Sequence, residues 1–206
     1  DLQVAKNGDL CATTYTTKGP LDKYEDRKFL AYMYRSKDDG KTWGEPTLIG
    51  AGNETTTLHL GGGRWLACAR TGTGVEKKDA LSLYGSVDDG RTWQFKRVLT
   101  GYQRVNGHLA KLKDGRILFS YGDRMSRYTL KGSDPGASER AKKLELISPA
   151  AQSGLEASIS SDGGETWSPA IRLADWNGAD GGYPSSVQRS DGQVVMAYYA
   201  SALPED

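Results

Sequence analysis

The residues of this chain best suited to chemistry are a carboxylate, a phenol and a guanidinium, carried by Glu54, Tyr183 and Arg70. A carboxylate beside a tyrosine can take the phenolic proton and turn a weak nucleophile into an aryloxide. An arginine offers a planar fork of donors that binds a ligand carboxylate in a bidentate manner. These residue types are therefore suited to nucleophilic substitution on an acidic substrate.

The spacing of these residues from repeated glycines predicts that they meet. Gly63, Gly115 and Gly192 each lie in a short turn between two apolar runs, which is typical of a tight β-hairpin. The residues nine positions before these glycines are Glu54, Asn106 and Tyr183. The residues seven positions after them are Arg70, Gly122 and Tyr199, and Tyr15 follows Gly8 by the same interval.

Equal offsets from the turn glycines indicate equivalent places on repeated strands, whose side chains converge around a shared axis. We therefore expect Glu54 and Tyr183 in one ring of side chains and Arg70 in a neighbouring ring. Asn106 shares the ring of Glu54 and Tyr183 and is a further candidate for substrate binding. An ordinary ion pair between Arg70 and Glu54, and a packed Tyr183 held extended before Pro184, are the structural alternatives.

The motif S-x-D-x-G-x-T-W occurs three times, as SKDDGKTW at 36–43, SVDDGRTW at 86–93 and SSDGGETW at 160–167. Within each box, the aspartate can accept backbone hydrogen bonds, the glycine allows an unusual backbone shape, and the tryptophan can pack between strands. We expect a structural role for all three boxes and a core position for their tryptophans. The repeated residues are Ser36, Asp38, Gly40, Thr42, Trp43, Ser86, Asp88, Gly90, Thr92, Trp93, Ser160, Asp162, Gly164, Thr166 and Trp167.

An alternating, aromatic-rich run precedes each box, namely FLAYMYR at 29–35, ALSLYG at 80–85 and LEASI at 155–159. With the glycine hairpins, these runs predict four short strands in about 50 residues, which is the scale of a propeller blade. The sequence therefore predicts an all-β fold, a β-propeller of four-stranded blades, as one partial domain over 1–206. The blade units are about 1–50, 51–101 and 102–178, followed by a first hairpin at 179–206.

Bulk composition limits the partners. The chain has 27 Lys and Arg against 26 Asp and Glu, a net charge of +1, so no single-sign field indicates nucleic acid or an anionic membrane. No apolar run approaches the roughly 20 residues of a membrane-spanning helix. Cys11 and Cys68 form either one disulfide or, as we expect, two buried thiols within strands. Because the sequence starts at Asp1 without methionine, we expect that a preceding segment was removed.

The boxes resemble the Asp-box (BNR) repeats of the sialidase superfamily, and the resemblance extends over essentially the whole chain. It implies a six-bladed propeller, of which three and a half blades are present, so we expect missing blades from this protein's longer chain or from another chain. NETTTLHLGGGRWLACAR at 53–70 matches the family's glutamate and following arginine. GGYPSSVQRSDGQVVMAYY at 181–199 matches its nucleophile stretch, with proline where serine is common.

What the resemblance implies is an exo-acting glycoside hydrolase that cleaves terminal sialic acid, or a related acidic sugar, with retention. Tyr183 would be the nucleophile, Glu54 its base and Arg70 the ligand of the sugar carboxylate. Sialidases are among the glycosidases that use a tyrosine nucleophile. The resemblance implies no cofactor, and it implies export to a secreted or periplasmic location.

This sequence departs from the family at the arginine clamp. SGLEASISSDGG at 153–164 carries no arginine ahead of the third box, and no F-R-I-P-like stretch is present. Arg124 or Arg140, both out of register, are the substitutes in the segment 121–147. Asp26 is the candidate acid, although its blade adjoins the Glu54 blade directly, whereas another blade intervenes in sialidases. Otherwise Asp26 is a solvated charge within the run at 23–28.

Two other functions remain open. A non-catalytic Asp-box propeller that binds glycans or proteins would fit the missing arginine, since one fold hosts many roles. A hydrolase for a sugar without the carboxylate would fit it as well. No second histidine or cysteine stands at ligand spacing from His108, which disfavours a metal site. The charged segment 124–147 is read as a surface insertion or as a loop that covers substrate.

Overall fold

The computed structural model describes residues 2–18, 28–71, 80–101, 103–124, 153–176 and 180–200. Every regular element within these ranges is a β-strand, and the strands form three four-stranded antiparallel sheets and one two-stranded sheet. Asp26 and Arg140, named above as candidate acid and candidate clamp residue, lie outside the described residues.

Each four-stranded sheet follows the chain order. Blade 1 contains β1 (Leu2–Val4), β2 (Leu10–Lys18), β3 (Lys28–Ser36) and β4 (Gly44–Ala51). Blade 2 contains β5 (Asn53–Gly61), β6 (Arg64–Thr71), β7 (Ala80–Ser86) and β8 (Gln94–Val98). Blade 3 contains β9 (Arg104–Lys111), β10 (Ile117–Asp123), β11 (Ser153–Ser160) and β12 (Ile171–Trp176), and the last sheet pairs β13 (Gly181–Gln188) with β14 (Val194–Ala200).

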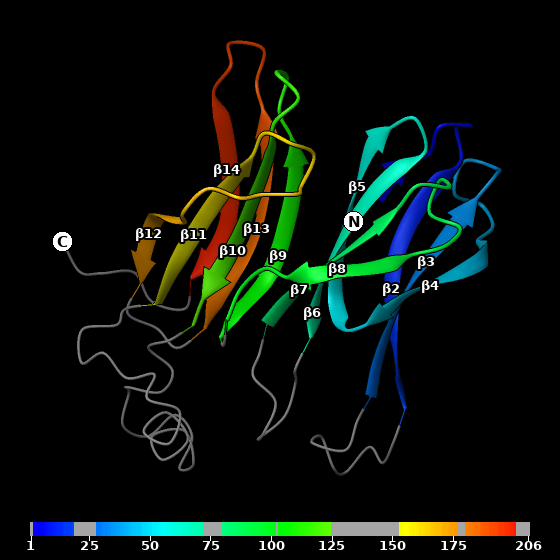
Figure 1. Ribbon diagram of the computed structural model, residues 1–206, viewed down its shortest axis with the longest axis horizontal. Helices are drawn as coiled ribbons and strands as arrows, with labels where there is room; N and C mark the ends of the chain where they lie inside the picture. Colours follow the sequence, from blue (N-terminus) through cyan, green and yellow to red (C-terminus); the bar gives the residue numbers. More distant parts are fainter. Residues whose placement is uncertain are drawn as a thin grey trace.

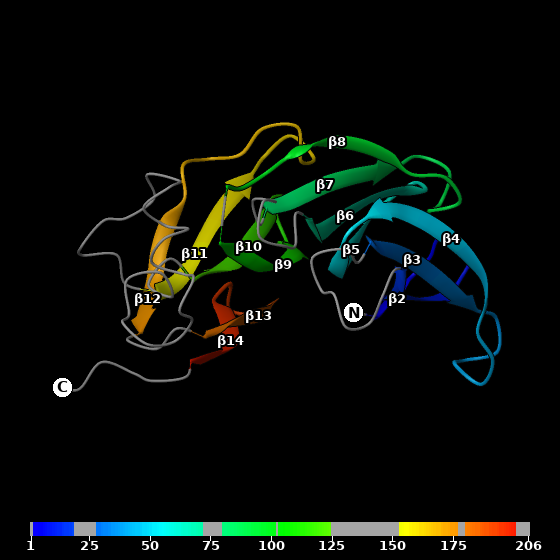
Figure 2. The same ribbon diagram turned by 90° about the horizontal axis from the view of Figure 1, so that it is seen from below.

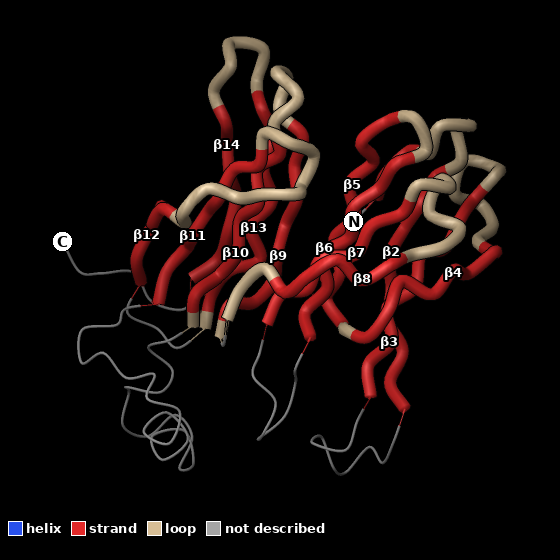
Figure 3. Tube along the Cα trace, in the orientation of Figure 1, coloured by secondary structure: helices blue, strands red, loops and turns tan. Residues whose placement is uncertain are grey.

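The sheets stand side by side in an arc (Figure 1). Seen from below, the first strands of blades 2 and 3 lie on the inner side of the arc, and β4, β8 and β12 lie on its outer side (Figure 2). Loops at one end of the sheets join β3 to β4, β7 to β8 and β5 to β6, while β5, β9 and β13 begin at the opposite end (Figure 3). This is the blade arrangement of a β-propeller, so the predicted fold class is confirmed; the described strands do not close a ring.

The box turns are held by their own side chains. In the second box, Ser86 Oγ donates to Asp88 Oδ1 at 2.8 Å and accepts from the Gly90 N–H at 2.9 Å. Asp88 also accepts from the Thr92 N–H at 2.9 Å and from the Thr92 hydroxyl at 2.6 Å. These hydrogen bonds lower the pKa of Asp88 to about 2. The same serine, aspartate and threonine bonds recur in the boxes at 36–43 and 160–167.

Two of the three box tryptophans pack between blades, not between the strands of their own blade. Trp93 lies on the cluster shared by blades 1 and 2, and Trp167 packs on the cluster shared by blades 2 and 3, with its ring 5.5 Å from that of Phe119. Trp43 is 41% exposed, because no described blade precedes the first one. The prediction of a core position is therefore wrong for Trp43.

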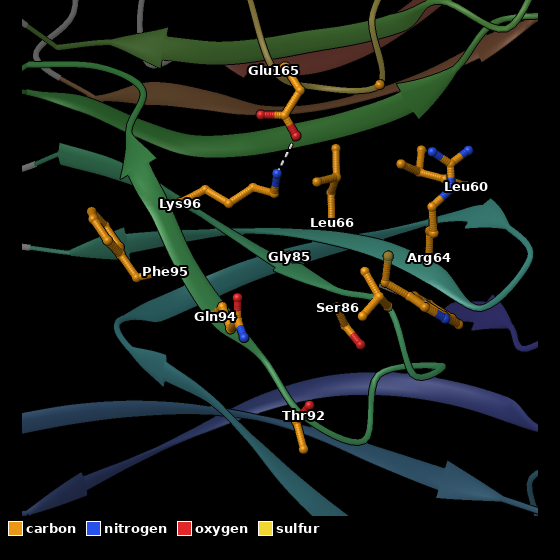
Figure 4. A pocket seen from close by; sticks show the side chains of 13 residues that line it. Leu60, Arg64, Leu66, Gly85, Ser86, Thr92, Gln94, Phe95, Lys96 and Glu165 are labelled. Atoms are coloured by element: carbon orange, nitrogen blue, oxygen red, sulfur yellow. Dashed lines mark hydrogen bonds and ion pairs between the residues drawn. The ribbon is translucent and has the colours of Figure 1, made fainter.

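Polar and charged groups also cross the seams between blades. Arg35 of blade 1 is 2% exposed and donates to the Asp89 carbonyl in the second box, while the Trp65 indole donates to Asp89 Oδ1 at 2.8 Å. At the next seam, a groove of about 280 Å³ lies between blade 2 and the third box. Lys96 and Glu165 form an ion pair across this groove (Figure 4). The box turns therefore lock neighbouring blades together.

Both cysteines are buried thiols within strands, as expected. Cys11 on β2 and Cys68 on β6 are each 0% exposed, and they belong to different core clusters. Burial raises the pKa of both thiols above the ordinary value. Neither group is therefore a reactive thiolate at neutral pH.

Candidate active site

Glu54, Asn106 and Tyr183 lie near the beginning of β5, β9 and β13, the inner strands of three consecutive sheets. Each lies where the pairing with the next strand is irregular. A β-bulge re-aims the side chain at such a point. Asn106 and Tyr183 also have positive φ values of 56° and 51°, which non-glycine residues seldom adopt. The register shifts lie between Asn53 and Thr55, between Ser120 and Gly122 opposite Asn106, and between Gly182 and Ser185.

The three bulged residues meet at the Glu54 carboxylate. Tyr183 donates its hydroxyl proton to Glu54 Oε1 at 2.5 Å, although the two residues are 129 positions apart. Glu54 Oε2 accepts from Asn106 Nδ2 and from Arg70 Nη1, each at 2.8 Å. All three partners donate, so both carboxylate oxygens serve as acceptors and the orientation of Glu54 is fixed from three sides.

A close approach of backbones brings Tyr183 to this point. A Cβ atom added at Gly122 of β10 would lie 3.0 Å from Gly182 Cα and 3.2 Å from the Gly181 carbonyl oxygen. Gly182 itself has a φ of +115°, which favours glycine. The start of β13 can therefore press against the end of β10 only because both positions lack side chains.

The phenol of Tyr183 lies between aromatic and cationic neighbours while remaining accessible. Its ring stacks on Tyr199 with centroids 5.9 Å apart, and the Arg124 guanidinium carbon lies 5.9 Å from its centroid. Tyr183 is 50% exposed. Partial burial, and then the hydrogen bond and negative charge of Glu54, raise the pKa of Tyr183 to about 12. The phenol is therefore protonated at neutral pH in the resting site.

Arg124 lies at the site although it does not stand at the repeat position of Arg70. Its guanidinium already forms hydrogen bonds and an ion pair with other groups of the protein. Arg124 is 5% exposed, and its Nε donates to the Gly181 carbonyl at 2.8 Å. Its Nη2 lies 2.9 Å from Asp180 Oδ1 and 3.0 Å from Asn106 Oδ1. Arg124 thus orients Asn106, which in turn orients Glu54. Arg70, whose side chain is 13% exposed, makes the Glu54 ion pair that was the structural alternative.

An open pocket of about 310 Å³ borders the Glu54–Tyr183 pair. Its walls are three consecutive residues from each of three inner strands, namely 54–56, 106–108 and 183–185. Thr56, His108 and Ser185 were not predicted from the sequence to belong to this site. The signal was available, because these residues stand seven positions before the turn glycines that place Glu54, Asn106 and Tyr183.

Other parts of the described molecule offer less chemistry. A hollow of about 590 Å³ between blade 3 and β14 has mostly apolar walls, including Leu112, Leu118 and Met196, and no carboxylate or phenol lines it. Among the described residues, no three or more His, Cys, Asp or Glu side chains gather where they could hold a metal ion. In the same ranges, no helix is long and apolar enough to cross a membrane.

Three solved structures illustrate the similarity of this fold to known proteins. A protein of unknown function from Dyadobacter fermentans is 25% identical, with a TM-score of 0.71 over 98% of this chain and 49% of that one. The α-L-arabinanase of Penicillium chrysogenum, solved with arabinobiose, is 20% identical, with a TM-score of 0.64 over 96% of this chain and 55% of that one. The Hadza microbial sialidase Hz136 is 16% identical, with a TM-score of 0.50 over 90% of this chain and 31% of that one.

The chain thus spans about half the length, or less, of these solved structures. Comparison with curated proteins finds no match. The family model described as a BNR repeat-like domain matches residues 2–196, which include all three S-x-D-x-G-x-T-W boxes and the Glu54–Tyr183 pair. The chain belongs to the BNR repeat-like domain family, as the Asp-box resemblance predicts.

Proposed function

We propose that this chain carries the reacting residues of a retaining, exo-acting glycoside hydrolase. The observation that supports this most is the 2.5 Å hydrogen bond from Tyr183 to Glu54 Oε1 at the edge of an open pocket. A base within hydrogen-bond reach of a hydroxyl nucleophile is the usual arrangement for covalent catalysis. The similar fold of an arabinanase and a sialidase agrees with this class of reaction.

In the proposed first step, the Tyr183 oxygen attacks the anomeric carbon while Glu54 takes the phenolic proton. The carbon–oxygen bond to the leaving group breaks, and the leaving oxygen takes a proton from an acid, for which Asp26 is our candidate. In the second step, water attacks the same carbon and the bond to the Tyr183 oxygen breaks. The carboxylate that the acid became in the first step takes a proton from that water, and Glu54 returns its proton to Tyr183. Two displacements at one carbon give net retention.

The first candidate substrate is a glycoside of terminal sialic acid or a related acidic sugar. A neutral phenol can approach a carbon that carries a carboxylate without the repulsion that a charged nucleophile would meet. Arg70, which donates to Glu54 Oε2, is the residue that we assign to the sugar carboxylate. Asn106 would keep Glu54 oriented while that contact forms.

The second candidate substrate is a neutral sugar, such as an arabinofuranoside. It is favoured by the contacts of the two guanidinium groups, since Arg70 binds Glu54 and Arg124 binds Asp180 and Asn106. Without a substrate carboxylate to repel it, Glu54 itself could attack the anomeric carbon, as carboxylates do in most retaining glycosidases. Tyr183 would then hold Glu54 in line through its hydrogen bond.

The test uses the full-length protein, an aryl α-sialoside and an aryl α-L-arabinofuranoside. The sialoside reading predicts that Tyr183→Phe and Glu54→Gln each abolish release of the phenol. The control is Tyr198→Phe, which alters an exposed tyrosine that stacks on Trp176, and it should retain full activity. Binding of sugars without hydrolysis of either substrate would refute the enzyme and leave a glycan-binding propeller.

A fluorinated sugar that traps the covalent intermediate separates the two candidate substrates. Mass spectrometry of the labelled peptide should find the sugar on Tyr183 after reaction with a 3-fluorosialosyl fluoride. A label on Glu54 after reaction with a 2-fluoroarabinofuranosyl fluoride would instead support the neutral-sugar reading. Turnover without either label would refute both assignments of the nucleophile.

A further inference from the structure

We propose that His108 binds the hydroxyl groups of a single sugar residue in the pocket and so determines which sugar is accepted. The inference rests on the proposed function, because it requires that the pocket beside Glu54 and Tyr183 receives a sugar. It adds a residue that no part of the reaction described above uses, and it assigns a role to the part of the pocket wall that lies further along the inner strands.

The pocket has two layers because its walls are short pieces of parallel inner strands. The first layer, near the beginnings of the strands, holds the reacting pair and Asn106, and the second layer, two residues further along each strand, holds Thr56, His108 and Ser185. Two residues along a strand span about 7 Å, which is comparable to the width of a sugar ring. A sugar whose anomeric carbon faces Tyr183 can therefore present its ring hydroxyls to the second layer.

The imidazole of His108 is the versatile polar group in that layer. Its Nδ1 lies 3.3 Å from Ser186 Oγ, which fixes the orientation of the ring. Burial lowers the pKa of His108, so the imidazole is neutral at neutral pH and has one donor and one acceptor. A sugar hydroxyl is both a donor and an acceptor, and it can therefore pair with the imidazole nitrogen that Ser186 does not contact.

The size of the pocket favours one sugar residue. A volume of about 310 Å³ is at the lower end of the range for small-molecule sites. Gly107, between Asn106 and His108, keeps the wall in place, since a Cβ atom there would lie 2.8 Å from Cys68 Sγ. The inner strand β9 thus packs directly on blade 2 next to His108.

The chain contains 2 histidines, which makes a direct test practical. His59, the second one, stacks on Trp65 with centroids 4.6 Å apart and lies 3.0 Å through Nδ1 from the Val4 carbonyl. It does not line the pocket. The two imidazoles give separate signals in heteronuclear NMR spectra, so His59 serves as an internal control for His108.

The experiment titrates isotope-labelled full-length protein with free N-acetylneuraminic acid and, separately, with L-arabinose. At least one sugar should shift the His108 imidazole signals to saturation while the His59 signals stay unchanged. His108→Ala should weaken that binding about fivefold, the value of one net hydrogen bond. His108→Gln, which keeps a donor and an acceptor, should recover most of the affinity.

The outcomes distinguish this inference from the proposed function. If a sugar shifts the signals of Asn106 and Tyr183 but not those of His108, and His108→Ala binds it equally well, the role of His108 is refuted and the sugar pocket stands. If neither sugar shifts any of these signals, the proposed function fails and the inference fails with it. The wild-type titration decides between these results even if His108→Ala does not fold.

Discussion

The coupling between Glu54 and Tyr183 can be measured directly by replacing the carboxylate with an amide. The pKa of Tyr183 is raised to about 12 from the ordinary 10.0, so its acid dissociation is roughly a hundredfold weaker than that of a free tyrosine. Burial contributes first, followed by the hydrogen bond to Glu54 and the charge of Glu54. In Glu54→Gln the charge is gone while the shape is kept.

We therefore expect the pKa of Tyr183 in Glu54→Gln to fall from about 12 toward 10.0. Of the causes that raise this pKa, burial remains unchanged in the variant, whereas the charge of Glu54 is removed. The acid-dissociation constant should rise by roughly tenfold or more. The assay is the ultraviolet titration of tyrosinate, taken as the difference between each protein and its Tyr183→Phe counterpart. This subtraction isolates one phenol among the 11 tyrosines of the chain.

Stability gives a second measurement of the same coupling. Because folding raises the pKa of Tyr183, its protonated form stabilises the folded wild type fully below pH 10, and this contribution is lost as the pH rises toward 12. In Glu54→Gln this loss should still begin near pH 10, the unfolded value, but it should end at lower pH and be smaller in total. An unchanged pKa of Tyr183 in Glu54→Gln would refute the reasoning, since burial alone would then account for the shift and the pair would not be coupled.

Three further predictions concern the scaffold and can be checked by urea unfolding. Gly90→Ala should destabilise the fold by roughly 2–4 kcal/mol, because the φ of Gly90 is +74° and an added methyl group would overlap Met33. Gly115→Ala, with a φ of +88° and no neighbour within 4 Å, should cost only about 1–2 kcal/mol of backbone strain, and equal losses would contradict the packing argument. Asp88→Asn should be less stable than the wild type above pH 4 but match it near pH 2. The ionised Asp88, whose pKa is lowered in the fold, stabilises the fold above the unfolded pKa, and this contribution is lost as the pH falls to about 2. A difference in stability that is constant with pH would contradict this. Trp93→Ala should lower the free energy of unfolding by roughly 3 kcal/mol and Trp43→Ala by much less, because only Trp93 packs between two described blades. Each indole donates one hydrogen bond within its own box, so a larger loss for Trp43 would show that packing between blades is not the cause.

The arrangement of blades and the partners of Glu54 follow from local patterns in the sequence. Turn glycines at equal offsets mark equivalent positions on inner strands, and this is why Glu54 and Tyr183, 129 positions apart, could be expected to meet. Asn106 could be placed between them by the same counting. These positions depend only on the number of residues between each inner-strand residue and its turn glycine. Short strands and tight hairpins keep that number constant from blade to blade.

Features that depend on contacts between blades could not be predicted in this way. Trp43 stands in the same box pattern as Trp93, and among the described blades only Trp93 has a preceding blade that covers its indole. Arg124 is out of register, yet it enters the site because the contact of Gly122 with Gly182 brings β13 against the end of β10. Both outcomes depend on residues far away in the sequence, which no local motif records.

The repeat separates stability from chemistry within each blade. The box turns and hairpin glycines lie at one end of the sheets, where their hydrogen bonds and their packing against the next blade hold the arc together. The bulged positions lie at the other end, where the repeated backbone presents a different side chain from each blade, an acid at Glu54, an amide at Asn106 and a phenol at Tyr183. Substitutions in the boxes should therefore change unfolding with little effect on the pKa of Tyr183, whereas Glu54→Gln should lower that pKa.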